Sequence, residues 1–202
     1  MFNYRTDIQL IQYSRSDEMV NSTRKLYHIL KNEIRENSGK EMVIICVGTD
    51  RSTGDSLGPL VGTILSEMKI KNFIVYGNID EPVHATNLEE TLNMVNQRHP
   101  NSFVIGIDAC LGRKKSIGKI SIKQQPLKPG AGVKKELPEV GHCSIVGVVN
   151  ISGFMEYLVL QNTRLSLVMK MANEIAGVIK LADRYLFRNS KIQSEVAATI
   201  TK

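Results

Sequence analysis

The sequence predicts an α/β fold, a three-layer sandwich whose mostly parallel central sheet has helices on both faces. Three observations support this fold class. Short apolar runs at 42–47, 73–76 and 103–109 predict buried strands. Segments with helical patterns separate these runs, and strands that alternate with helices are typical of parallel sheets. The chain has 202 residues, a length that suits one domain with a substantial core.

The chain divides into four successive segments of one domain. Residues 1–13 are expected to form a loose arm. Apolar residues recur at helical spacing in 14–38, which predicts a helix that ends at Asn37-Ser38-Gly39. The α/β core is expected at 42–187, and the last residues, 188–202, are expected to be frayed.

The first strand of the core leads into a polar loop and a helix. The loop, 48–58, is rich in Gly, Ser, Thr and Asp. Pro59 suits the first turn of a helix, because the N–H that proline lacks would have no partner there. That helix is expected to continue to about Met68.

The second strand is followed by a helix and then by the third strand. Thr86 and Glu89 have the spacing of a capping box, which predicts the start of a helix through Val95. Beyond Gly112 the pattern changes, and alternating isoleucines predict a half-exposed strand. The remaining segments are predicted to be a long surface loop, a buried strand and two helices, at 124–140, 143–149, 153–160 and 165–187.

Composition and charge narrow the function classes. The net charge is +6, and basic residues cluster at Arg113-Lys114-Lys115 and Lys134-Lys135. A nucleic-acid surface is one interpretation, but there is no tryptophan, zinc-finger spacing or aromatic-rich RNA-binding motif. A solvated basic rim around a cleft is therefore favoured, and direct nucleic-acid binding is not expected.

The apolar runs and cysteines indicate a cytoplasmic protein. No apolar run has the length of a membrane span, and the first residues lack a signal-peptide core. Cys46, Cys110 and Cys143 have no metal-ligand spacing, which favours reduced thiols. Cys110 remains an alternative nucleophile because it lies two residues after Asp108.

Two aspartates are the candidate catalytic residues. Asp55 lies in the polar loop, and Asp108 lies where the apolar strand 103–109 is expected to end. Ligands bind at the carboxyl ends of strands in open α/β sheets. If the two strands are parallel neighbours, the carboxyls approach each other and tend to share one proton. Such a pair can activate a water for attack on an amide, or hold a metal with a third ligand.

Structural interpretations of the same loop remain open. Asp55 could equally cap the helix that begins near Pro59. Asp50 is interpreted as a turn aspartate that bonds to its own backbone. Arg51 either neutralises the acids or is an ordinary surface residue. Nothing follows Asp108 that it would cap, so the functional interpretation is stronger there.

Three motifs in order carry a resemblance to a known family. Thr53-Gly-Asp-Ser-Leu-Gly-Pro59, Ile107-Asp-Ala109 and Pro129-Gly-Ala-Gly-Val133 resemble motifs of the germination (spore) protease of spore-forming bacteria. The closer similarity is to its smaller relatives, the YyaC-like sporulation proteins. The resemblance spans about residues 42–185. It implies the α/β sandwich fold of hydrogenase maturation proteases, to which the germination protease is related.

The resemblance also implies an activity. It identifies the chain as a peptidase that hydrolyses peptide bonds with Asp55 and Asp108 in a sporulating cell or spore. The implied substrates are small acid-soluble proteins that coat spore DNA, and no cofactor is expected. Candidates for substrate binding lie in the acid loop and in the segment 129–133, which would form a backbone wall for a peptide: Asp50, Arg51, Gly130 and Gly132.

Departures from the family pattern keep two alternatives open. Gly54 stands where the protease tends to have proline, and the chain is shorter than the protease. A binding or regulatory protein that keeps the fold without the chemistry is the first alternative. The second is a peptidase that binds a divalent metal. Hydrogenase maturation proteases bind nickel with two acids and a histidine, which would correspond here to Asp55, Asp108 and His142.

Overall fold

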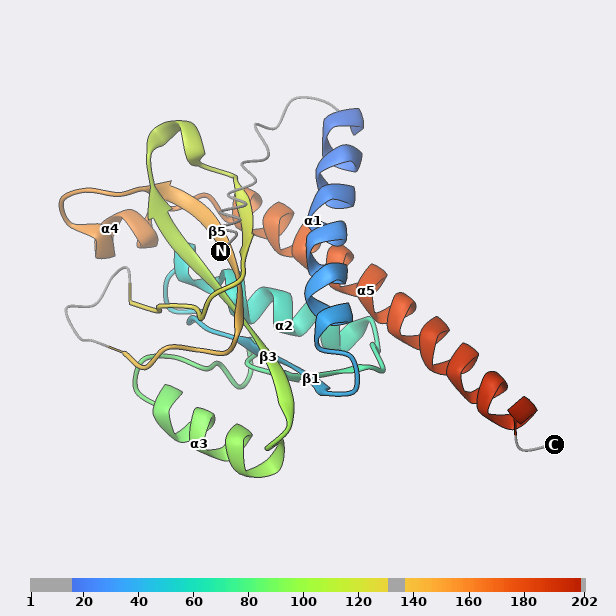
Figure 1. Ribbon diagram of the computed structural model, residues 1–202. Coiled ribbons are helices and arrows are strands. Elements are labelled where there is room, and N and C mark those ends of the chain that lie inside the picture. The colour runs from blue at the N-terminus through green and yellow to red at the C-terminus, as the bar shows by residue number, and fades with distance from the viewer. Residues whose placement is uncertain (1–15, 131–136, 201–202) are drawn as a thin grey trace, which may run out of the picture.

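The computed structural model describes residues 16–130 and 137–200, with side chains described at 22–130 and 137–190. The predicted arm at 1–13 and the basic pair Lys134-Lys135 lie outside the described residues. The chain folds into a five-stranded sheet with helices on both faces (Figure 1).

The sheet has the strand order β2-β1-β3-β5-β4. Its first four strands in this order are parallel, and only β4 runs antiparallel, against β5. The mostly parallel sheet predicted from the apolar runs is therefore confirmed. The strand bounds are β1 Glu41–Cys46, β2 Phe73–Tyr76, β3 Ser102–Gly112, β4 Ile120–Lys123 and β5 Cys143–Ile151.

Three helices cover one face of the sheet and one helix covers the other (Figure 1). The first face carries α1 Ser16–Glu36, α2 Leu57–Glu67 and α5 Leu165–Ile200, and the second carries α3 Leu88–Arg98. A short helix, α4 Glu156–Gln161, follows β5. No helix in the described part of the chain combines the length and apolar character needed to cross a membrane.

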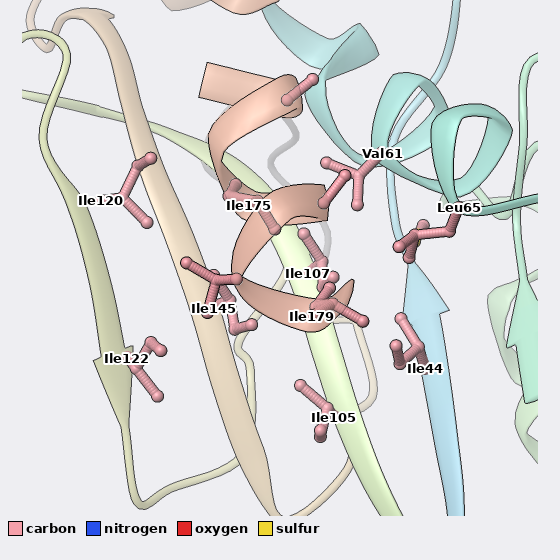
Figure 2. Close-up of a cluster of buried hydrophobic side chains, with 14 of the residues drawn as sticks. Ile44, Val61, Leu65, Ile105, Ile107, Ile120, Ile122, Ile145, Ile175 and Ile179 are labelled. Atoms are coloured by element: carbon pink, nitrogen blue, oxygen red, sulfur yellow. The ribbon is translucent and has the colours of Figure 1, made fainter. Parts of the chain in front are cut away.

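The larger core layer joins the central strands to α2 and α5. Figure 2 shows isoleucines of β1, β3 and β5 pointing toward Val61 and Leu65 of α2 and toward Ile175 and Ile179 of α5. All of these side chains are almost completely buried. Each contributes about 1.5–3 kcal/mol to folding. The layer holds β1, β3 and β5 side by side, so their carboxyl ends open at one edge of the sheet.

The strand that carries Asp108 is longer than the sequence predicts. β3 continues to Gly112 because β5 pairs with it along this stretch, with Asp108 opposite Val146 and Gly112 opposite Ile151. The pairing contains a register shift after Cys110, where β5 has an extra residue. Asp108 therefore lies inside a strand of the sheet rather than at its end.

The predicted capping box at the start of α3 is wrong. Asn87 is the N-cap residue, and no side chain caps the helix. The Thr86 hydroxyl lies 2.9 Å from Nδ1 of His84, and Oδ1 of Asn87 accepts the backbone N–H of His84 at 2.8 Å. These polar groups hold the preceding loop instead of the helix end.

The end predicted to be frayed, 188–202, is helical over its described residues, 188–200. Helix α5 continues past Phe187 to Ile200. Residues 188–200 contain neither glycine nor proline, so this segment has no strong helix breaker.

Helix α2 begins against the end of β1 with almost no space between the backbones. A Cβ atom at Gly58 would lie 2.1 Å from the carbonyl oxygen of Val47. This contact requires glycine, because backbone atoms cannot move aside as a flexible side chain can.

We expect Gly58→Ala to destabilise the protein by about 1–3 kcal/mol through this overlap, despite the better helix propensity of alanine. The matched control is Gly177→Ala in α5, where a Cβ would meet nothing within 4 Å. That variant should be more stable by up to about 1 kcal/mol. Urea unfolding monitored by circular dichroism measures both. Equal stability of Gly58→Ala and the parent would contradict the close packing of α2.

Candidate functional site

A pocket of about 390 Å³ opens at the carboxyl edge of the sheet. Its walls come from the loop after β1, the loop before α3, β3, the segment at 129–130 and helix α4. Both candidate catalytic residues, Asp55 and Asp108, line it together with Arg51, His84 and Gly130. The structure thus brings together residues that are far apart in the sequence.

The loop that carries Asp55 folds back on itself. Gly48 has a positive φ of 142°, and a Cβ there would lie 2.0 Å from the carbonyl oxygen of Asp55. The backbone N–H of Thr49 donates to that same oxygen at 3.1 Å. Asp55 itself lies in a single turn of 3-10 helix, η1 Gly54–Ser56, directly before α2. The turn holds Asp55 beside the central strands.

The Asp55 side chain is not a helix cap. The N-cap residues of η1 and α2 are Thr53 and Ser56, and neither helix has a side-chain cap hydrogen bond. The carboxyl is half-buried, and burial raises its pKa. A hydrogen bond from the Thr49 backbone and the charge of His84 oppose this effect and lower the pKa of Asp55. The capping interpretation is therefore wrong.

Asp108 is the more deeply buried of the two acids, with 7% of its surface exposed. Oδ1 accepts the backbone N–H of Ala109 at 2.7 Å. Burial, and then the charge of Asp55, raise the pKa of Asp108 well above its usual value, which the Ala109 hydrogen bond only partly offsets. The two acids are therefore a coupled pair, in which ionisation of one opposes ionisation of the other.

Only some of the predicted substrate-binding residues line the pocket. Arg51 and Gly130 line the pocket. Asp50 is exposed and lies outside the lining, so the structure does not support its predicted role in binding. Among the described residues, its side chain makes no bond to its own backbone: the side chain of Thr49 accepts the Arg51 N–H at 3.3 Å instead. Gly132 lies outside the described residues.

His142 does not join the aspartate pair, which corrects the predicted metal ligand set. Its Nδ1 accepts the backbone N–H of Val104 at 3.0 Å, and its ring stacks on Phe103. Val104 precedes Asp108 by four residues, or about 13 Å along a strand. Among the described residues, no group of three His, Cys, Asp or Glu side chains is arranged to hold a metal ion.

Cys110 is not placed as a nucleophile either. Burial and the charge of Asp108 raise the pKa of its thiol to about 11. A thiol with this pKa remains protonated at neutral pH, whereas the thiolate is the nucleophile.

The structure adds pocket residues that the sequence analysis did not identify. Tyr157 and Leu160 of α4 form one wall. Their apolar pattern is that of any short helix, so no sequence signal distinguished them. Ser52 also lines the pocket, and its buried hydroxyl has no hydrogen-bond partner among the described residues. His84 also lines the pocket, as its position on a proline-containing loop at the strand ends predicts.

Comparison with known sequences identifies close relatives. The family described as "Protein of unknown function (DUF1256)" matches residues 14–178. The "Uncharacterized protein YyaC" of Bacillus subtilis (strain 168) is 53% identical over 171 residues, which cover 85% of this chain and 83% of the relative. The similarity to YyaC that the three motifs indicated is therefore confirmed.

Comparison with solved structures supports the fold. The NiFe hydrogenase maturation protease HycI from Thermococcus kodakarensis KOD1 superposes with a TM-score of 0.53 at 19% sequence identity. The alignment covers 77% of this chain and 99% of that protein. At this identity the similarity concerns the fold alone, and it confirms the predicted three-layer architecture.

The raised pKa of Asp108 gives the protein a characteristic dependence of stability on pH. An unfolded aspartate titrates near pH 3.9, so the folded protein binds the extra proton more tightly. The resulting stabilisation is complete below about pH 4 and is lost as the pH rises through the pKa of Asp108 in the folded protein. It amounts to about 1.4 kcal/mol for each unit by which the folded pKa exceeds the unfolded one.

We therefore expect Asp108→Asn, which cannot ionise, to melt at a higher temperature than the parent at pH 8. This difference should shrink toward pH 4. The control is Asp50→Asn, an exposed change in the neighbouring loop, which should follow the parent throughout. Thermal melts from pH 4 to 8 test this, and a constant difference between Asp108→Asn and the parent would contradict it.

Proposed function

The chain belongs to the family described as "Protein of unknown function (DUF1256)", and we propose that it is a peptidase that cleaves peptide bonds with Asp55 and Asp108. One observation carries this proposal. The two carboxyls come from separate segments, line one pocket, and interact so that the charge of Asp55 raises the pKa of Asp108. A carboxyl pair that shares one proton can act as base and acid on an amide.

The two acids take different roles in the proposed reaction. Asp55 is less buried and is the carboxylate that removes a proton from a water molecule. The water oxygen attacks the peptide carbonyl carbon while Asp108 donates its proton to the carbonyl oxygen. When the C–N bond breaks, Asp55 passes its proton to the leaving amine and the hydroxyl of the intermediate returns a proton to Asp108. The pair then regains its starting state.

His84 keeps Asp55 ionised in the proposed reaction. Its charge lowers the pKa of Asp55 and so favours the carboxylate. The loop is fixed through the contacts of His84 with Thr86 and Asn87. His84 is a positioning residue in this scheme, because it acts through Asp55.

The proposed biological setting is sporulation. It rests on the three motifs that resemble those of the germination protease, and it names small acid-soluble spore proteins in the sporulating cell as substrates. The net charge of +6 supports an acidic protein substrate, since a basic rim attracts acidic segments. Arg51 and Gly130 line the pocket, and this supports their assignment to binding the peptide.

A binding protein without chemistry is the second candidate. The low exposure of Asp108 favours it, because a reacting acid must reach the substrate carbonyl. This candidate differs from the first in one measurable way: peptide binding would persist without any turnover in the parent protein.

Cleavage of small acid-soluble spore proteins, followed by mass spectrometry, tests the peptidase. We expect Asp55→Asn and Asp108→Asn each to lower the rate by about 10²–10⁴-fold, the contribution typical of a general acid or base. Asp50→Asn should retain the rate of the parent. Retained cleavage in both pocket variants would remove the aspartates from the mechanism. Absence of cleavage by the parent would favour the binding protein.

The acid limb of the pH–rate profile should report Asp55. His84→Gln removes the charge that lowers the pKa of Asp55, so this pKa rises. Since the reaction needs Asp55 ionised, activity should be lost at a higher pH in His84→Gln than in the parent. The control is His28→Gln, an exposed position on α1. An unchanged acid limb in His84→Gln would exclude the positioning role.

A further inference from the structure

The segment around α4 exposes an unusual amount of apolar surface. Phe154 is 92% exposed and Tyr157 is 62% exposed. Large apolar residues seldom gather on a surface that binds nothing. We call this region the α4 surface; it consists of Ile151, Phe154, Met155, Tyr157, Leu158 and Leu165, all exposed.

The α4 surface is firmly attached to the rest of the fold. The side-chain amide of Asn150 donates to the carbonyl of Val159 and to the hydroxyl of Thr163, each at 3.2 Å. On the inner side of α4, Leu160 is buried, and a Cβ at Gly54 would lie 2.8 Å from it. The outward side chains are thus exposed because the fold holds them there. The same contact joins α4 to η1, the turn that carries Asp55.

The backbone at the start of α4 is strained. Met155 has φ 59° and ψ 47°, the left-handed conformation, although it carries a side chain. This conformation costs about 1–2 kcal/mol for residues other than glycine. Strain of this kind gathers at functional sites. Here it occurs beside two exposed side chains, those of Phe154 and Met155 itself.

The α4 surface is continuous with the pocket. Tyr157 belongs to both, because it lines the pocket that holds Asp55 and Asp108 and is also largely exposed. A peptide that reaches the two acids can therefore also contact α4 through Tyr157.

Basic residues border the α4 surface. β3 and β5 end side by side, with Gly112 opposite Ile151 and the Ser152 N–H donating to the Gly112 carbonyl at 2.8 Å. The chain continues from Gly112 into Arg113, Lys114 and Lys115, all exposed. None of the three forms an ion pair with another residue in the described ranges. Their charges are thus available to a partner.

We propose that the α4 surface binds bulky apolar side chains of the peptide substrate, and that Arg113, Lys114 and Lys115 bind acidic residues next to them. This inference rests on the proposed function, since it assigns the substrate class to that same pocket. The substrate is an extended protein segment in which Phe, Leu or Met lies close to Asp or Glu. Continuity with the pocket and complementary charge together favour this occupant.

A synthetic library of 12-residue peptides with randomised positions tests the preference. The protein used is Asp108→Asn, which retains the pocket and stops turnover. We expect bound peptides to be enriched in bulky apolar residues beside acidic ones. Adding Phe154→Ser and Tyr157→Ser should remove the apolar enrichment and weaken binding of the selected peptides by at least roughly tenfold. Adding Lys114→Glu and Lys115→Glu should remove the acidic enrichment.

The control is Leu181→Ser, an exposed apolar residue of α5 outside the α4 surface, which should change neither preference. Absence of binding, or preferences that survive both sets of substitutions, would overturn the inference. Vesicles of equal parts phosphatidylcholine and phosphatidylglycerol address a membrane surface. Vesicle binding that depends on Phe154, without any peptide preference, would also overturn it.

The outcomes separate this inference from the proposed function. Selected peptides that bind through α4 but are never cleaved by the parent would remove the peptidase and leave a peptide-binding surface. Peptides that are cleaved equally well with and without the α4 substitutions would keep the peptidase and remove the α4 surface from substrate selection.

Discussion

The close contact between α2 and the end of β1 determines where everything in the pocket can lie. A Cβ at Gly58 would lie 2.1 Å from the Val47 carbonyl, and one at Gly62 would lie 1.8 Å from the Gly77 carbonyl. Backbones this near place the start of α2, and with it the loop before α2, directly against the end of the sheet. Asp55 is therefore held above the central strands, where its charge reaches Asp108. Backbone packing thus brings the two acids together, and their burial and charges then set how they interact.

Burial of this pair opposes folding, and the core on the other side of the strand compensates for it. Burial raises the pKa of both acids, so ionisation of either is unfavourable in the folded protein. The neighbouring positions of β3, Ile105 and Ile107, are completely buried against α2 and α5. β3 thus carries both the buried isoleucines of the core and a buried acid whose ionisation is unfavourable. Acids in such an environment are typical of functional sites.

Local sequence patterns predicted the sheet and the acid pair. They did not predict features that depend on how two strands align or on which hydrogen-bond partner a side chain takes. Buried strands have long apolar runs, so β1 and β3 were predictable, and parallel neighbours bring Asp55 and Asp108 together. The place of His142 depends on how β5 aligns with β3, which no local pattern encodes. Thr86 had the right spacing for a cap, but His84 binds its hydroxyl. The exposed face of α4 has the composition of a buried helix.

The register shift between β3 and β5 divides the site into two parts that can change independently. Asp108 lies before the shift, where the strands keep a regular alignment, and the segment that leads from β5 to α4 lies after it. An extra residue in β5 already separates the two alignments, so the sheet tolerates a change of length at this point. Insertions or deletions in that segment would alter its outer surface without moving Asp108. Divergence among descendants of a common ancestor could therefore change what is recognised while the reacting groups stay fixed.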